Sequence, residues 1–304
     1  MSALLERHPD NPIITPKDLP FEAYSVFNAG AVRHQGNYLL LLRIELRTRL
    51  TVFHVATSPD GIHFKVNPTP IDYPLSAVER GCSRINRFDM RITPLDGTYY
   101  ICHAVWLEPW GSCIGIAQTD DFVRFRQISL SVPSNRNAVL FPEKIGGRYV
   151  RLERPQNIDG AGTMWVSESP DLVYWGNPRP VMLPYSEWGN RKNGASCVPI
   201  KTRQGWLEIY HATCLTASTE NYQLGVCLLD LEDPSKVVAA PQEFILAAEE
   251  PYECIGQVPN VVFTGGACLA DDGKLNIYYG GADTRLCLAQ TTVDKLVDFC
   301  LGKA

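Results

Sequence analysis

An acid between two arginines is the feature of this sequence most suited to chemistry. Asp89 lies in Ile85-Asn-Arg-Phe-Asp-Met-Arg-Ile-Thr93, a strand-like stretch that places Arg87 and Arg91 two residues away on either side. A carboxyl group with cations at close range can transfer a proton in catalysis. The same pattern also describes a structural salt bridge, so the residue types alone leave both interpretations open.

Basic and polar side chains recur in other strand-like segments. Arg43 and Glu45 follow a run of leucines, where charges are costly unless they face a polar channel, although an edge-strand ion pair fits equally well. Alternation places Arg151 and Arg154 on opposite strand faces. Each such residue alone is typical of a surface charge or a buried histidine, but their recurrence at one phase of successive repeats favours a shared site. The other candidates are Asn28, Arg136 with Asn137, Lys192 in a loop rich in Gly and Asn, and His211 at a strand end.

The elements that must position these side chains are β-strands. Runs rich in β-branched and aromatic residues occur throughout the chain, as at 37–43, 98–103, 206–211 and 275–279. Dipeptides such as Gly36-Asn37 and Asp96-Gly97 separate them and can supply the positive φ of a tight hairpin. Because helical periodicity is nearly absent, the pattern predicts an all-β protein with antiparallel sheets.

A degenerate repeat organises these strands. Each copy is a short apolar strand, a polar turn containing Ser or Thr and Asp, and an aromatic or aliphatic return. Five units fill the chain without a linker, which predicts one five-bladed β-propeller domain over residues 1–304. The turn aspartates are about 50 to 62 residues apart: Asp60, Asp121, Asp171, Asp233 and Asp294.

Composition and charge exclude several classes of protein. The net charge is −5 and no run of basic residues occurs, so nucleic acid and membrane partners are not expected. The N-terminus lacks the apolar core of a secretory signal, and we expect a cytoplasmic location. The ten cysteines, including Cys102, Cys227, Cys268 and Cys287 in apolar runs, indicate buried free thiols. Without CxxC or HExxH spacing, we expect no metal and no cofactor. Assembly into a homo-oligomer stays open.

Taken in order, these segments resemble glycoside hydrolase family 130, the β-mannoside phosphorylases and related β-mannosidases, over nearly the whole chain. The sequence departs from the family at Met90, at Glu153 and at Ala212-Thr213. The segments that carry the resemblance are Asn11-Pro-Ile-Ile-Thr15, Val26-Phe-Asn-Ala-Gly-Ala31, Leu41-Leu-Arg-Ile-Glu45, Asp89-Met-Arg-Ile-Thr93, Leu140-Phe-Pro-Glu-Lys144, Glu153-Arg-Pro155, Gly205-Trp-Leu-Glu-Ile-Tyr-His211, Val258-Pro-Asn-Val-Val-Phe263 and Tyr278-Tyr-Gly-Gly-Ala-Asp283.

The resemblance implies a role for each candidate. Asp89 corresponds to the proton donor, which in the family reaches the glycosidic oxygen through the mannosyl 3-hydroxyl. Asn28 and Asp283 correspond to residues that hold the non-reducing mannosyl unit, and Arg91 and Tyr210 are further expected substrate contacts. The family's phosphate contacts fall on Arg43, Arg136, Asn137, Arg154, Lys192 and His211.

Charge separates the possible reactions. An inverting hydrolase needs a second carboxylate to activate water, with Glu253 or Glu208 as candidates here. A phosphorylase instead needs cations that neutralise and aim inorganic phosphate as co-substrate, and Arg136, Lys192 and His211 suit that task. The sequence therefore favours a phosphorylase acting on a β-mannosidic oligosaccharide and releasing α-mannose 1-phosphate. A hydrolase and a sugar-binding propeller without turnover are the alternatives, and linkage and acceptor stay open.

Overall fold

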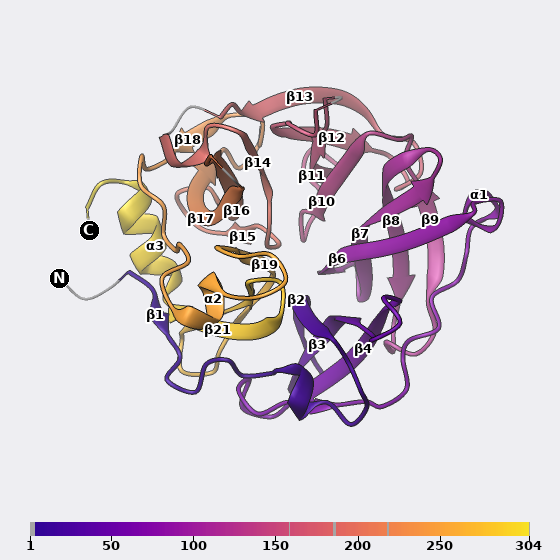
Figure 1. Ribbon diagram of the computed structural model, residues 1–304. Helices are drawn as coiled ribbons and strands as arrows, with labels where there is room; N and C mark the ends of the chain where they lie inside the picture. Colours follow the sequence, from indigo (N-terminus) through magenta and orange to yellow (C-terminus); the bar gives the residue numbers. More distant parts are fainter. Residues whose placement is uncertain (1–3, 158, 185–186, 218, 304) are drawn as a thin grey trace.

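The computed structural model describes residues 4–157, 159–184, 187–217 and 219–303. Their strands form five antiparallel sheets that are arranged as blades around a common centre (Figure 1). This arrangement confirms the five-bladed β-propeller predicted from the repeat. The first strand of each blade lies nearest the centre, and chain order follows the ring.

The blades have similar strand orders. The first contains β2 (Ser25–His34), β3 (Asn37–Glu45), β4 (Thr51–Ser58) and β5 (Lys65–Val66), and the second contains β6 (Arg84–Leu95), β7 (Thr98–Glu108), β8 (Gly111–Thr119) and β9 (Arg126–Leu130). The third contains β10 (Asn135–Leu140), β11 (Tyr149–Pro155), β12 (Met164–Ser169) and β13 (Gly176–Met182). The fourth contains β14 (Lys192–Ala195), β15 (Ile200–Lys201), β16 (Trp206–Leu215), β17 (Glu220–Leu229) and β18 (Val237–Ala239).

The fifth blade joins the two ends of the chain. It contains β19 (Val262–Leu269), β20 (Leu275–Gly281) and β21 (Arg285–Thr291), and its outer strand is β1 (Glu6–Arg7). Arg7 also donates to both carboxylate oxygens of Glu253, at 2.8 and 3.0 Å. The N-terminal strand therefore closes the ring. Among the described residues, the helical elements are α1 (Ala77–Arg80), α2 (Pro251–Cys254), α3 (Val293–Cys300) and two 3₁₀ turns (Pro16–Asp18, Glu187–Gly189).

Hydrogen bonds explain the repeated Ser/Thr and Asp turn. In the second blade, Thr119 Oγ1 accepts from the Phe122 amide at 2.9 Å, and Asp121 Oδ1 accepts from the amides of Val123 and Arg124 at 2.9 and 2.8 Å. The turns at Ser58–Asp60 and Ser169–Asp171 have the same bonds. Satisfied backbone donors thus fix the hairpin between the third and fourth strands.

The last two copies differ from the sequence prediction. In the fourth, Asp230 rather than Asp233 accepts the two turn amides, from Glu232 and Asp233 at 2.9 Å each. In the fifth, the strand is followed by α3, a helix that the sequence analysis missed. The side chain of Thr292 caps its first turn. In this blade α3 follows the third strand in the chain, and the fourth strand is β1 from the N-terminus.

Packing of blade against blade explains the unbroken leucine run in β3. Leu40, Leu41 and Leu42 are 0 % exposed. Leu40 and Leu42 pack in one core cluster and Leu41 in another, as strand alternation requires. A middle strand covered on both faces therefore reads as continuously apolar. All ten cysteines are free, and Cys102, Cys227, Cys268 and Cys287 are buried as expected.

The innermost strands share an irregularity. The strand register shifts between Val26 and Ala29 in β2, between Phe88 and Arg91 in β6, and between Arg136 and Val139 in β10. The register of β19 shifts between Thr264 and Gly266, and the fourth blade has an interruption between β14 and β15. Such bulges redirect side chains and are frequent next to active sites. Asn28, Asp89 and Asn137 all lie within them.

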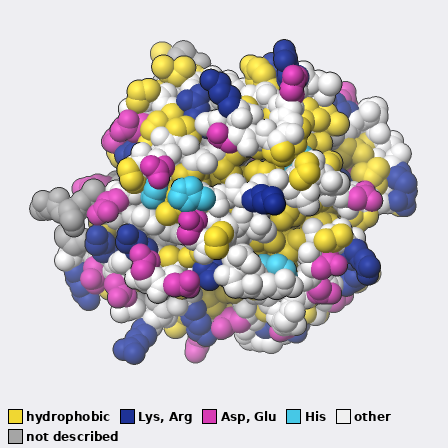
Figure 2. Space-filling model, turned by 90° about the horizontal axis from the view of Figure 1, so that it is seen from below, with side chains coloured by type: hydrophobic (Ala, Val, Ile, Leu, Met, Phe, Trp, Pro, Cys, Tyr) yellow, Lys and Arg dark blue, Asp and Glu magenta, His cyan; other side chains and the backbone are white. Residues whose placement is uncertain are grey.

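Charges of both signs are mixed on the surface. On the face shown in Figure 2, Lys and Arg side chains are interspersed with Asp and Glu side chains. Within the described part of the chain, none of the helices is both long enough and apolar enough to span a membrane.

Candidate active site

A cavity of about 280 Å³ lies among the innermost strands. Five residues predicted from the sequence line it: Asn28, Arg43, Asp89, Arg136 and Asp283. They come from the first, second, third and fifth blades, so the propeller brings together residues that are distant in the chain. The remaining lining residues had no expected role: they are Asn86, Phe88, Tyr222, Val258, Val261 and Phe263.

Asp89 lies at the second-blade bulge with a left-handed backbone (φ 57°) and is only 4 % exposed. Its Oδ1 is 3.8 Å from Arg43 Nη1, and its Oδ2 is 3.5 Å from Arg136 Nη2. The carboxylate therefore faces guanidinium groups from the first and third blades. These loose contacts across blades differ from the local salt bridge that the sequence left open.

The two arginines next to Asp89 in sequence have other partners. Arg87 binds Glu79, with Nη2 2.5 Å from Oε1. Arg91 is 0 % exposed and donates to three backbone carbonyls, those of Asp89 at 2.7 Å and of Ala195 and Ser196 at 3.2 Å. Arg91 was expected to bind substrate, but its side chain lies outside the cavity lining. It instead ties the Asp89 bulge to the fourth blade.

Phe88 organises the two cations that face Asp89. The guanidinium of Arg136 lies 4.8 Å from the Phe88 ring centroid, and that of Arg43 lies 5.5 Å from it and 4.0 Å from the Phe27 ring. Cation–π contacts of this kind hold arginines without neutralising them. An aromatic residue one position before the acid gave no functional signal in the sequence, because most such residues belong to a core.

His211 marks where the cations converge. Burial lowers the pKa of His211 well below its ordinary value, and the charges of Arg154, Arg91, Lys192 and Arg136 lower it further. Four cations therefore act on one buried imidazole. Burial, and then the charge of Arg136, also lowers the pKa of Arg154 to about 9, which still leaves this guanidinium protonated at neutral pH.

Hydrogen bonds fix the tautomer of His211. Arg154 Nη1 can only donate, so His211 Nε2 accepts from it at 3.0 Å. The proton of the neutral ring is then on Nδ1, which donates to Ser196 Oγ at 2.9 Å. Gly194 permits this packing, because a Cβ there would lie 3.0 Å from His211 Cε1. Ser196, which the sequence analysis missed, thus contacts both the His211 ring and, through its carbonyl, Arg91.

Lys192 lies on β14 rather than in the predicted loop, and it has an acidic partner. Its Nζ is 2.5 Å from Glu220 Oε2 and 5.2 Å from the Tyr222 ring. Burial acts to raise the pKa of Glu220, but the hydrogen bond and charge of Lys192 hold it below its ordinary value. Among the predicted cations, Lys192 is therefore the one whose charge is balanced most directly.

Several buried polar atoms, in residues that line the cavity or were expected to bind phosphate, have no partner among the described residues. Both amide atoms of Asn137 belong to this group, and Asn137 has a left-handed backbone (φ 55°). Buried polar groups are normally hydrogen-bonded, so such a concentration indicates a site prepared for a polar ligand. The other atoms are Asn28 Nδ2, Asn86 Oδ1 and the Nε atoms of Arg43, Arg136 and Arg154.

Three other predicted residues lie away from the cavity. Tyr210 was expected to contact substrate, but it is 3 % exposed and packs in the core, with its ring stacked 5.9 Å from Trp188. Glu253 accepts hydrogen bonds from Arg7, Tyr279 and two backbone amides. Glu208 is 0 % exposed and accepts from the Ser196 amide. Neither glutamate lines the cavity as the base of a hydrolase would.

Asp283 gives the site a pH dependence that can be measured. Burial and the charge of Asp89 raise its pKa to about 6, although Arg43 opposes the change. The folded protein therefore holds this proton more tightly than the unfolded chain, and the associated stability is present below the unfolded pKa near 3.8 and lost as the pH rises through about 6. The shift corresponds to roughly 2–3 kcal/mol.

We expect Asp283→Asn to unfold at higher urea concentration than the wild type at pH 7.5 and to lose this advantage at pH 4.5. The amide has no charge to bury at either pH. Asp72→Asn, at an exposed aspartate, is the control and should show no such change. An equal difference between wild type and Asp283→Asn at both pH values would contradict the raised pKa.

A five-bladed propeller that joins carboxylates and several cations at its centre fits the carbohydrate-active enzyme that the sequence resembles. The profile of glycoside hydrolase family 130, described as beta-1,4-mannooligosaccharide phosphorylase, matches residues 5–301. The chain therefore belongs to this family.

Individual relatives agree with the family match. The chain is 37 % identical to the beta-1,4-mannooligosaccharide phosphorylase of Ruminococcus albus, over 96 % of this chain and 90 % of that protein. It is 34 % identical to a 1,2-beta-oligomannan phosphorylase of a Thermoanaerobacter species, over 94 % and 96 %. The structure of beta-1,2-mannobiose phosphorylase from Listeria innocua in complex with beta-1,2-mannobiose superposes with a TM-score of 0.86 at 27 % identity, covering 98 % and 99 % of the two chains.

Proposed function

We propose that this chain is an inverting β-mannoside phosphorylase that transfers a non-reducing-end mannosyl unit to inorganic phosphate and releases α-mannose 1-phosphate. The observation that carries the proposal is a cluster of basic side chains: Arg43 and Arg136 line the cavity beside Asp89, at 3.8 and 3.5 Å, and Arg154 donates to the buried His211 at 3.0 Å. So many cations near one point suit a bound dianion better than water. The relatives with phosphorylase names support the same reaction.

Asp89 is the proton donor in this proposal. Its position in the bulge, between guanidinium groups of the first and third blades, suits a group that must be held against the sugar while the leaving oxygen gains a proton. The relay through the mannosyl 3-hydroxyl stays a prediction. Asn28 of the first blade and Asp283 of the fifth, which both line the cavity, would bind sugar hydroxyls.

Phosphate would bind on the other side, against Arg136, Arg154 and Lys192. Because Arg154 donates to His211 Nε2, His211 first positions this arginine. His211 itself can donate to phosphate only with a change of tautomer. Asn137, with both amide atoms free of protein partners, suits a phosphate oxygen or a sugar hydroxyl.

The hydrolase alternative has a single candidate for its second carboxylate, because only Asp89 and Asp283 supply carboxyl groups among the lining residues. In this proposal Asp283 holds the sugar, and since its pKa is raised to about 6, it is protonated and cannot accept a proton from water below that pH. The relatives include β-1,4 and β-1,2 phosphorylases, so linkage and acceptor stay open. The cytoplasmic location and any homo-oligomer also remain predictions.

The reaction is tested with β-1,4- and β-1,2-mannobiose in the presence and absence of inorganic phosphate. We expect consumption to require phosphate, and phosphorus NMR to detect a sugar 1-phosphate of α configuration. With α-mannose 1-phosphate and a suitable acceptor, the reverse reaction should release phosphate. Free mannose formed at the same rate in phosphate-free buffer would overturn the proposal in favour of the hydrolase.

A further inference from the structure

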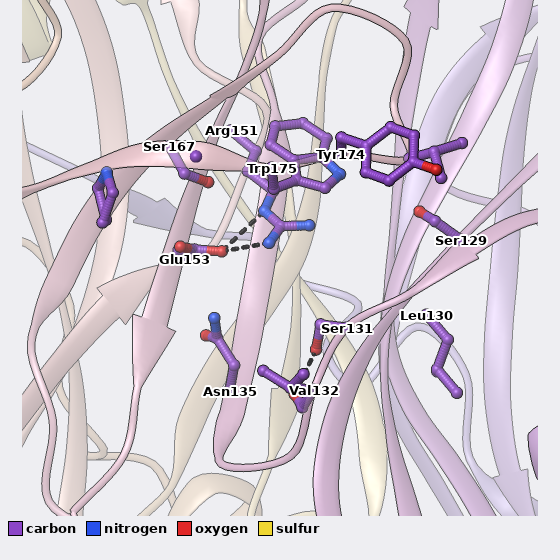
Figure 3. Close-up of a pocket in the computed structure, with 13 residues that line it drawn as sticks. Ser129, Leu130, Ser131, Val132, Asn135, Arg151, Glu153, Ser167, Tyr174 and Trp175 are labelled. Atoms are coloured by element: carbon purple, nitrogen blue, oxygen red, sulfur yellow. Dashed lines mark hydrogen bonds and ion pairs between the residues drawn. The ribbon is translucent and has the colours of Figure 1, made fainter.

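A second pocket, of about 380 Å³, lies between the second and third blades (Figure 3). Its lining includes Ser129 and Leu130 from β9, Asn135 from β10 and the turn before β13. None of its lining residues belongs to the central cavity. The volume falls in the range of about 300–1,000 Å³ that is usual for small-molecule sites.

The floor of this pocket is polar and built from buried side chains. Arg151 and Glu153 are 4 % and 5 % exposed, and Nε and Nη2 of Arg151 both contact Glu153 Oε2, at 2.7 and 2.6 Å. Ser167 faces Arg151 across the β11–β12 ladder and is 2 % exposed, and its Oγ has no partner among the described residues. Figure 3 shows these three side chains and Asn135 grouped around one space.

Strand alternation separates this floor from the central site. Arg154 reaches His211 on one face of β11, whereas Arg151 and Glu153 point to the opposite face, as the sequence predicted for Arg151 and Arg154. The same division holds on β10, where Arg136 lines the central cavity and Asn135 the second pocket. The two pockets therefore lie on opposite faces of β10.

The chemistry of the second pocket selects a neutral, hydroxyl-rich ligand. Glu153 balances the charge of Arg151, so neither an anion nor a cation is favoured. A carboxylate, a guanidinium, an amide and a hydroxyl can together accept from and donate to several sugar hydroxyls. At the rim, Tyr174 is 75 % exposed and can cover the apolar face of a sugar ring.

We infer that the pocket between the second and third blades binds a sugar unit of a manno-oligosaccharide, separately from the catalytic cavity. Only the choice of mannose rests on the proposed function, because the pocket's own chemistry selects a neutral sugar. Such a site would hold a longer manno-oligosaccharide on the enzyme while the other end of the same oligosaccharide is processed in the catalytic cavity.

Two variants test this inference by isothermal titration with β-1,4- and β-1,2-mannotriose. The titrations use Asp89→Asn protein without phosphate, so that ligand is not consumed. We expect two binding events per chain. Adding Ser167→Ala or Tyr174→Ala should weaken one event at least about tenfold and leave the other unchanged. Arg124→Ala, at the same turn position as Tyr174 in the second blade, is the matched control and should retain both events.

Folding cannot account for the expected loss in Ser167→Ala. The Ser167 hydroxyl is buried without a protein partner, so its removal should leave the melting temperature unchanged or raise it. Phosphorolysis of mannobiose by the Ser167→Ala enzyme should equal that of the wild type. A single binding event that neither variant alters would overturn the inference. Two events in an enzyme that does not require phosphate would instead overturn only the proposed function.

Discussion

Asp89→Asn should fold like the wild type and lose phosphorolysis by about 100- to 10,000-fold in kcat. Asparagine has almost the same shape as aspartate and tolerates the left-handed backbone of residue 89 (φ 57°), so the bulge should persist. It has no acidic proton to give to the leaving oxygen. Initial rates with mannobiose at saturating phosphate measure this loss, and circular dichroism verifies the fold.

A better leaving group separates proton donation from general damage to the site. With 4-nitrophenyl β-mannoside, departure needs little protonation, so the deficit of Asp89→Asn should shrink by at least about tenfold. Removal of the other lining carboxylate, in Asp283→Asn, should give no such dependence on the leaving group. Near wild-type turnover of mannobiose by folded Asp89→Asn would show that another group is the acid.

The propeller could be predicted because its signals are local. Alternating strands, glycine-containing hairpins and turns such as Thr119–Asp121 depend on residues within about ten positions of one another. Where a copy is degenerate, the local signal fails. Asp233 was expected at the fourth turn because it preserves the spacing, but Asp230 accepts the turn amides.

The site was predicted less accurately than the fold, because the direction of side chains in the innermost strands depends on bulges. A bulge is defined by the register with the neighbouring strand, which Ile85–Thr93 alone does not encode. The sequence therefore identified Asp89 but could not show that Arg43 and Arg136, rather than Arg87 and Arg91, face its carboxylate.

The burial of individual side chains was the second property that could not be predicted from the sequence. Arg91 and Tyr210 were expected to contact substrate, yet the first is bound to carbonyls of two blades and the second packs beside Trp188. Both depend on contacts between residues about 20 to 100 positions apart in the chain. For the same reason no local signal marked Ser196, whose contacts connect His211 to Arg91.

Arg136→Ala should raise the KM for phosphate by about 10- to 100-fold while changing the affinity for mannoside much less. One hydrogen-bonded charge in a desolvated site stabilises an anion by about 1.5–3 kcal/mol, which corresponds to this range. Steady-state kinetics with phosphate varied at fixed mannobiose give the KM. Titration of mannobiose without phosphate gives the sugar affinity.

Comparison with Lys192→Ala distinguishes phosphate binding from support of the acid. Both cations act on His211, but only Arg136 also lies beside Asp89, at 3.5 Å. At saturating phosphate, the turnover of Lys192→Ala should therefore approach that of the wild type, whereas that of Arg136→Ala should recover only in part. Removing Lys192 also takes away the 2.5 Å partner of Glu220 and leaves it, among the described residues, only Arg191, at 3.6 Å, to balance its charge, so Lys192→Ala/Glu220→Gln should recover some phosphate affinity. If neither Arg136→Ala nor Lys192→Ala changed the KM for phosphate, the cations around His211 would be structural, and the hydrolase would become the better interpretation.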